Sequence, residues 1–340
     1  MPQAFAKTLC SLLLITAFAC TSDDALTPAV DPYAFVQPPH FPEPTYDLEN
    51  EPITKAGFEL GKKLFSELRL SRTNDVACEN CHAQATAFAD PQHGLSIGVE
   101  NRIGSRNAPD LANLAFAKDF LWDGGIVHLD FVPTNAITAF HEMDLPLAEA
   151  VARLNSFPEY QPLFEEAFGA DTVTSAFMLK AFSQYTLRLV SANSKYDKYV
   201  LGLEGGSFGE AELRGLEAFR QNCASCHAGE LFTDQSYRNN GLDTAFSDLG
   251  RADITELAQD EGKFRVPSLR NLERTAPYMH DGRFDSVVEV LEHYRSGVNA
   301  SATLDPSLRN GIQLTDREVE DLEAFLLTLT DWDFIRDDIF

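Results

Sequence analysis

The sequence has few cysteines and few basic residues, and no long hydrophobic run follows its first twenty residues. Of 340 residues only six are Cys, and 27 Lys and Arg stand against 52 Asp and Glu, giving a formal net charge of −25. This acid excess argues against nucleic acid as a partner, because phosphates would be repelled. It permits docking of a basic partner protein, although simple solubility explains the charge equally well. No convincing alternation of strand residues is present, which favours an all-α class with substantial loops.

The first twenty residues have the pattern of an export signal. One positive charge precedes an apolar run around Leu12–Ile15, and small residues lead to Cys20. The run is too short to cross a membrane as a mature helix. Ala17-Phe18-Ala19-Cys20 is similar to a loose lipobox and favours a lipid on Cys20, although the small residues also fit ordinary signal cleavage. Cys10 lies in the same segment, so no disulfide framework remains in the mature chain.

These patterns predict the cell compartment and the start of the mature chain. We expect a signal peptide of lipoprotein type at 1–20 and a Pro-rich tether at 21–50. The protein would then be periplasmic or in the cell envelope, with membrane contact only through the lipid on Cys20. A homodimer is left open.

Two short stretches carry the strongest chemical signal: Cys78-Glu79-Asn80-Cys81-His82 and Cys223-Ala224-Ser225-Cys226-His227. Each is a C-x-x-C-H pattern, in which two thiols one turn apart can add to the vinyl groups of a haem while the His binds the iron. A shared zinc site would need Cys pairs far closer in sequence, and a thioredoxin-like dithiol needs no His after its second Cys. We therefore predict two covalently bound c-type haems, with His82 and His227 as iron ligands.

Similar helical patterns precede the two haem motifs. Thr54–Leu68 and a second helix, which Ser207-x-x-Glu210 would open as a capping box, carry apolar residues at helical spacing. Gly61 and Gly215 lie at matching places in the two patterns, as if one close helix contact were used twice. The repeat predicts two cytochrome c-like domains with one covalent haem each, at 51–201 and 202–340. Three more helices are expected near 146–154, over 176–190, and after the capping box Thr315-x-x-Glu318.

Six further stretches follow the haem motifs in a fixed order. They are Ser96-Ile97-Gly98, Arg106-Asn107-Ala108-Pro109, Phe120-Leu121-Trp122-Asp123-Gly124, His141-Glu142-Met143, Val266-Pro267-Ser268-Leu269-Arg270-Asn271 and Thr275-Ala276-Pro277-Tyr278-Met279-His280-Asp281-Gly282. In this order and spacing the chain, from about Pro52 to its closing helix, resembles the bacterial di-haem cytochrome c peroxidases and their MauG-type relatives. The resemblance implies that the His82 haem is the peroxidatic one and that the His227 haem transfers electrons.

The resemblance also implies roles for individual residues. Glu142 would sit over the open face of the first haem as the catalytic acid/base, for which a buried carboxylate with a raised pKa is suited. Trp122 would relay electrons between the haems. Asn107, Thr275 and Pro277 would bind calcium at the domain junction through an amide and backbone carbonyls, although ordinary turn chemistry also favours these residues.

The sequence departs from many of these peroxidases at both iron centres. Where they place a His that blocks the first haem until reduction, this chain has Val99, and His93 has the wrong offset to replace it. Where they supply a Met to the second haem, this chain has Tyr294, as in the MauG type. Met279 and His293 are alternative ligands.

The best interpretation is a peroxidase that reduces hydrogen peroxide to water with electrons from a small redox protein such as cytochrome c. The alternatives are a MauG-like enzyme that oxidises side chains of a partner protein, and a non-catalytic di-haem electron carrier. Val99 and Tyr294 favour the MauG-like alternative. The electron carrier would leave Glu142 without a role.

Overall fold

A computed structural model describes Met1, residues 31–90 and residues 93–340. The predicted signal peptide, with Cys10 and Cys20, and the first part of the tether lie outside the described residues. Residues Pro32–Phe340 form one compact unit. Within the part of the chain that is described, no helix combines the length and the apolar character that a bilayer crossing requires.

The described residues are mostly helical, which confirms the predicted class in its coarse form. The α-helices are α1 (Lys55–Phe65), α2 (Cys78–Cys81), α3 (Val132–Thr138), α4 (Leu147–Ser156), α5 (Gln161–Phe168), α6 (Ser175–Leu187), α7 (Lys195–Val200), α8 (Glu210–Asn222), α9 (Ala252–Thr255), α10 (Val287–Glu292), α11 (Asp316–Leu327) and α12 (Trp332–Ile335). A π-helical turn, His293–Gly297, continues α10. The strands β1 (Tyr237–Arg238) and β2 (Phe264–Arg265) form one antiparallel pair, with Tyr237 opposite Arg265. Short 3₁₀ turns and loops connect these elements.

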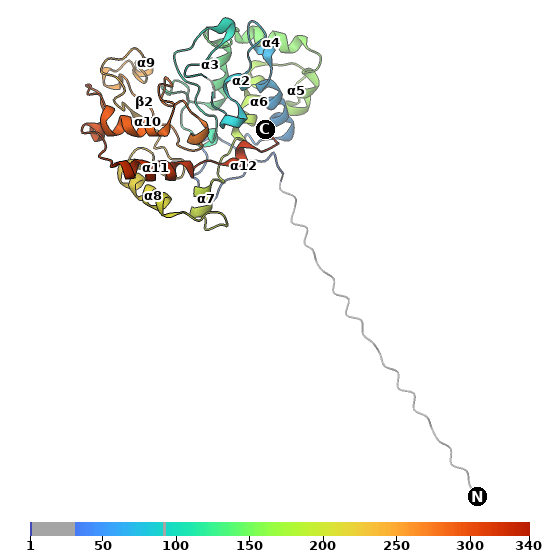
Figure 1. The fold of residues 1–340 in the computed structure, drawn as a ribbon. Coiled ribbons are helices and arrows are strands. Elements are labelled where there is room, and N and C mark those ends of the chain that lie inside the picture. Colours follow the sequence, from blue (N-terminus) through green and yellow to red (C-terminus); the bar gives the residue numbers. More distant parts are fainter. Residues whose placement is uncertain (2–30, 91–92) are drawn as a thin grey trace. The chain divides into compact units, whose positions relative to one another are not determined.

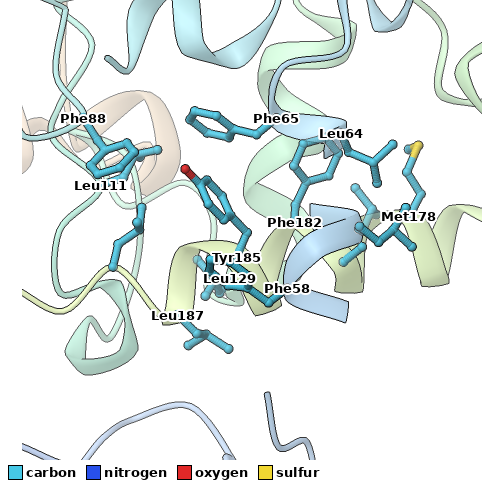
Figure 2. Close-up of a cluster of buried hydrophobic side chains, with 14 of the residues drawn as sticks. Phe58, Leu64, Phe65, Phe88, Leu111, Leu129, Met178, Phe182, Tyr185 and Leu187 are labelled. Atoms are coloured by element: carbon cyan, nitrogen blue, oxygen red, sulfur yellow. The ribbon is translucent and has the colours of Figure 1, made fainter. Parts of the chain in front are cut away.

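The first hydrophobic core lies around α1 and α6. Thr54 caps α1 by accepting a hydrogen bond from the Gly57 N–H at 3.0 Å. One turn further on, a Cβ on Gly61 would lie 2.0 Å from the carbonyl oxygen of Ala181 in α6, so only glycine allows this approach. Aromatic and aliphatic side chains from both helices meet in this core, as Figure 2 shows.

The second hydrophobic core lies between α8 and α11, which run side by side in Figure 1. Here a Cβ on Gly215 would lie 1.8 Å from the carbonyl oxygen of Asp321. The expectation that Gly61 and Gly215 make the same kind of helix contact is therefore confirmed. The division into domains at residue 202 stays a prediction, because side chains from the C-terminal half, such as Leu231 and Phe334, also belong to the first core.

One expected cap is wrong and another is confirmed. Helix α8 is capped by Gly209 rather than Ser207, because the Glu212 carboxylate accepts the Gly209 N–H at 2.6 Å and so fixes the start of the helix at Glu210. At α11 the predicted box forms, since Thr315 accepts from the Glu318 N–H while the Glu318 carboxylate accepts from the Thr315 N–H.

A buried ion network joins three distant parts of the chain. Arg270 donates two hydrogen bonds to Asp197, at 2.8 and 2.9 Å, and a third to the carbonyl oxygen of Glu230 at 2.7 Å. The Nε2 of His40, from the segment predicted as a tether, lies 2.7 Å from the Asp197 Oδ1, which also accepts from Arg270. Burial alone would raise the pKa of Asp197, but Arg270, with smaller contributions from Ser194 and His40, outweighs it and lowers that pKa. The network thus fixes the loop that follows the second haem motif.

Candidate functional site

The first C-x-x-C-H motif forms a single helical turn followed by a fixed histidine. Helix α2 contains Cys78 and Cys81, both partly buried and free of disulfides. The Nδ1–H of His82 donates to the carbonyl oxygen of Phe88 at 2.8 Å. Burial lowers the pKa of His82, which favours the neutral imidazole. With Nδ1 engaged in this way, Nε2 is the nitrogen available to a metal, which is the usual arrangement of a ligating histidine.

The second motif repeats this arrangement. The Nδ1–H of His227 donates to the carbonyl oxygen of Phe232 at 3.0 Å, and burial again lowers the pKa of the imidazole. Phe88 and Phe232 both have a left-handed backbone, with φ of 64° and 52°. This conformation is uncommon for a residue other than glycine. We did not predict either phenylalanine from the sequence, because its role rests on its backbone and not on its side chain.

A large cavity of about 430 Å³ opens beside the first motif. It is lined by Cys78, Cys81 and His82 together with mostly apolar side chains and a few polar ones. Its volume lies within the range of roughly 300–1,000 Å³ typical of cofactor pockets. Paired thiols, an imidazole with a free Nε2 and an apolar cavity fit a covalently attached haem.

The structure brings Glu142 into the same cavity as the first motif. Glu142 lines the cavity, and burial raises the pKa of its carboxyl above the ordinary value. The Glu142 carbonyl oxygen accepts the Val99 N–H at 2.8 Å, which ties the two loops together. Val99 is fully buried, and its side chain is not among the described residues that line the cavity. His93 does not line it either, and its ring pairs with Asp90.

Trp122 lines the cavity and bridges the two halves of the chain. Its indole N–H donates to the carbonyl oxygen of Asn107 at 2.9 Å, and its own carbonyl oxygen accepts the N–H of Arg265 in β2 at 2.7 Å. Arg265 also lines the cavity, and burial lowers its pKa. Nearby, burial raises the pKa of Asp110 to about 6. We did not single out Arg265 or Asp110 from the sequence, since neither stands in a distinctive motif.

The three candidate ligands of the second haem share one neighbour, Asn240. Burial chiefly raises the pKa of Tyr294, to about 12, and the charges of the Cys223 and Cys226 thiols add to this rise. The Asn240 side chain lowers that pKa. The Sδ of Met279 accepts from the Nδ2 of Asn240 at 3.3 Å.

The remaining predicted residues lie near the junction between the halves. The Asn107 N–H donates to the carbonyl oxygen of His280 at 2.7 Å, and its side-chain amide donates to the carbonyl oxygen of His93 at 3.3 Å. Thr275 and Pro277 precede His280 in the same loop. The Thr275 N–H donates to the carbonyl oxygen of Leu272. The imidazole of His280 stacks on Phe264, with ring centroids 3.7 Å apart.

Comparison with known proteins identifies the family. The model described as di-haem cytochrome c peroxidase matches residues 55–205. The methylamine utilization protein MauG of Methylophilus methylotrophus is 34% identical over 301 residues, covering 87% of each chain. The cytochrome c551 peroxidase of Pseudomonas aeruginosa is 32% identical over 330 residues, covering 94% of this chain and 90% of that protein. The chain therefore belongs to the di-haem cytochrome c peroxidase family, and family membership implies two c-type haems.

A solved structure supports the same assignment. A MauG-like protein associated with microbial copper homeostasis matches with a TM-score of 0.83 and 32% sequence identity, covering 89% of this chain and 97% of that one. The predicted resemblance to peroxidases and MauG-type proteins is thus confirmed.

Proposed function

We propose that the protein is an exported di-haem peroxidase that reduces hydrogen peroxide to water with electrons from a small redox protein such as cytochrome c. One observation carries the proposal: Glu142 shares a mostly apolar cavity with the first C-x-x-C-H motif. A haem binding site with an acid/base carboxyl beside it suits peroxide chemistry better than simple electron transfer. Membership of the peroxidase family supports the same reaction class.

The haems would be held by the two motifs. Cys78 and Cys81 would form the thioether bonds of the peroxidatic haem, and Cys223 and Cys226 those of the electron-transfer haem. His82 and His227 would bind the irons through Nε2, since Nδ1 of each ring is engaged by a backbone carbonyl. Tyr294 would be the other protein ligand of the second iron, in line with its position near the second pair of thiols.

Glu142 would move the protons of the reaction. When bound there, a haem would supply the redox chemistry needed for cleavage of the peroxide O–O bond. The Glu142 carboxylate would accept a proton from one peroxide oxygen and return it to the other, which leaves as water. Two electrons and two protons then convert one hydrogen peroxide into two waters. The raised pKa of Glu142 suits a group that must both accept and donate a proton.

Trp122 would carry electrons from the second haem toward the first. Its backbone and its indole are hydrogen-bonded to segments from different halves of the chain, Arg265 and Asn107. Two such bonds hold the ring at the edge of the first cavity in one orientation. A fixed aromatic ring beside the first haem site suits the relay that the family resemblance implies.

Several finer predictions remain part of this proposal. Calcium would bind at the junction through Asn107, Thr275 and Pro277. The chain would divide near residue 202 into two cytochrome c-like domains, and a lipid on Cys20 would hold it in the periplasm. Whether the protein dimerises is left to a measurement of its mass in solution.

Haem content is the decisive first experiment. Protein made in a host that matures c-type cytochromes should show two haems per chain by pyridine haemochrome assay and by mass spectrometry. It should then oxidise reduced cytochrome c when peroxide is added. One haem, or bound zinc, would contradict the proposal.

A second candidate function is the oxidation of side chains in a partner protein. Two observations favour it: the position of Tyr294 near the second pair of thiols, and the 34% identity to the protein named MauG. Proteins encoded beside this gene can be incubated with the enzyme and peroxide, and analysed by mass spectrometry. A modified neighbour combined with slow cytochrome c oxidation would favour this candidate over the peroxidase.

A further inference from the structure

Tyr294 occupies an unusual position in the backbone. It lies in the π-helical turn His293–Gly297, which continues α10 without a break. Such turns are rare and are often found at functional sites, because the extra residue in the turn changes the direction of a side chain. Here Tyr294 is close to Cys223 and Cys226.

A single residue, Asn240, contacts all three candidate ligands of the second iron. Its side-chain amide donates to the Sδ of Met279 at 3.3 Å, and the same side chain acts on the Tyr294 hydroxyl by lowering its pKa. Its backbone carbonyl oxygen accepts a hydrogen bond from the Nε2 of His293 at 3.0 Å. His293 therefore has its Nε2 occupied, and only Met279 and Tyr294 compete for the iron.

The neighbours of Asn240 hold it in place from both sides. The buried Asn239 amide donates to Ser301 at 3.0 Å and to Thr303 at 2.9 Å, and its side-chain oxygen accepts the Gly241 N–H at 2.8 Å. Gly241 has φ of +75°, and a Cβ there would lie 2.6 Å from a methyl group of Val298. This packing requires glycine and leaves Asn240 little freedom to move.

We propose that Asn240 is a positioning residue that selects Tyr294 over Met279 as the second axial ligand of the His227 haem. The amide N–H engages the thioether sulfur and holds Met279 in its present position. The same side chain orients the phenol oxygen, which keeps lone pairs free for a metal. The inference rests on the proposed function, because it requires a haem on the second motif.

The test replaces Asn240 by residues of similar size that lack its donors. In holoenzyme with both haems, Asn240→Leu should release Met279, so that the second haem gains the near-infrared charge-transfer band of methionine ligation. Its midpoint potential should rise, because methionine in place of an anionic ligand favours the reduced state. Asn240→Asp has nearly the same shape and also lacks the donors, so it should change the spectrum in the same direction if the leucine variant folds poorly.

Two controls separate this inference from the proposed function. In the double variant Asn240→Leu with Met279→Leu, the methionine band should be absent, and the spectrum of the first haem should stay unchanged throughout. If both haems are present, Tyr294→Phe alters the second haem, and yet Asn240→Leu and Asn240→Asp keep the native spectrum and potential, the role of Asn240 is wrong. If the native protein binds no haem at Cys223–His227, the proposed function itself fails.

Discussion

At the scale of single residues, the two haem motifs are alike on one side and different on the other. Each histidine donates its Nδ1–H to the carbonyl oxygen of a phenylalanine with a left-handed backbone, Phe88 or Phe232. Around these similar histidines the surroundings differ: the first site shares its cavity with Glu142, whereas Tyr294 and Asn240 belong to the proposed second site. The difference in function between the sites is therefore expected to lie with these surrounding residues.

Replacing Glu142 should slow peroxide turnover without loss of haem. Glu142→Gln keeps the size of the side chain but cannot exchange a proton, so we expect a decrease of about 100-fold or more, in the range usual for general acid–base residues. Steady-state oxidation of reduced cytochrome c measures this effect. The exposed Glu149, changed to Gln, is the matched control and should leave turnover unchanged. Near-normal turnover in Glu142→Gln would remove this residue from the mechanism.

The same carboxyl should determine a pH dependence. Burial raises the pKa of Glu142 above the ordinary carboxyl value of about 4.3. As the pH is lowered, the Glu142 carboxylate should therefore take up its proton earlier than an ordinary carboxylate would. The rate of reaction with peroxide should therefore fall as the pH is lowered through this raised pKa. Stopped-flow measurements across this range should show the decrease in the native protein and no such step in Glu142→Gln.

At the scale of elements, the Val99 loop (residues 96–104) is attached firmly to the loop that carries Glu142. A Cβ on Gly98 would lie 2.2 Å from the carbonyl oxygen of His141, and the Val99 N–H donates to Glu142. Arg102 pairs with Glu100 of the same loop and with Asp144 across the contact. Ion pairs near the surface contribute little by themselves, but the close backbone contact adds to them. This attachment favours a loop that does not open and close over the first haem.

The oxidised protein should therefore react with peroxide directly. Valine cannot bind iron, and in the described structure Val99 is buried outside the cavity lining. Electron paramagnetic resonance of the ferric protein should show one high-spin and one low-spin haem. Stopped-flow mixing should show a rapid reaction without prior reduction. Two low-spin haems, with activity only after partial reduction, would mean that another residue covers the first iron.

The complementary variant tests the attachment of the loop. Val99→His alone should leave the first haem high-spin, because the attached loop keeps residue 99 away from the cavity. Adding Asp144→Asn, which weakens the ion pair with Arg102, should increase any low-spin fraction. A fully low-spin first haem in Val99→His alone would show that the loop moves freely.

At the scale of the whole molecule, the buried network of His40, Asp197 and Arg270 connects segments that are far apart in sequence. Arg270 and Asp197 are each 1% exposed, so neither charge can be compensated by water if the other is removed. Through the carbonyl of Glu230 the network also supports the loop that ends at Phe232, the partner of His227. The fold and the second haem site therefore share one source of stability.

Removing the carboxylate of this network should destabilise the protein strongly. Asp197→Asn leaves Arg270 buried without a countercharge, which typically costs about 3–5 kcal/mol. The free energy of unfolding from denaturant titration of the holoenzyme measures the loss. Asp316→Asn, which breaks the exposed pair with Arg295, is the matched control and should leave the free energy of unfolding almost unchanged. Equal effects of the two variants would contradict the importance of burial.

The network should also contribute to acid sensitivity. Arg270 lowers the pKa of Asp197 in the folded state, so its contribution is complete above the unfolded value of about 3.9 and is lost as the pH falls through the lower folded value. Denaturant titrations should therefore show that the stability difference between the native protein and Asp197→Asn decreases as the pH falls below that unfolded value.

Much of the local structure could be predicted from the sequence, but the contacts between distant segments could not. The Cys and His spacing and the Thr315 cap depend on nearby residues, which a sequence pattern records directly, and the close helix contacts of Gly61 and Gly215 could be inferred only because the pattern before each motif repeats. The cap at Gly209 was missed because two acidic residues, Glu210 and Glu212, compete for the same pattern. The π-helical turn at Tyr294 and the contacts of Asn240 depend on the packing of loops from three regions, which no local pattern indicates.

The backbone origin of the two histidine contacts also limits how this protein can evolve. A side-chain partner is lost by a single substitution, whereas a carbonyl oxygen remains whatever residue stands at position 88 or 232. Substitution there can reach the histidine contact only indirectly, by disturbing the left-handed turn, which β-branched residues tolerate poorly, or by removing a buried ring from the core. Variation in redox behaviour among descendants of this chain should therefore accumulate around Glu142 and Asn240, while the histidine side of each site stays nearly the same.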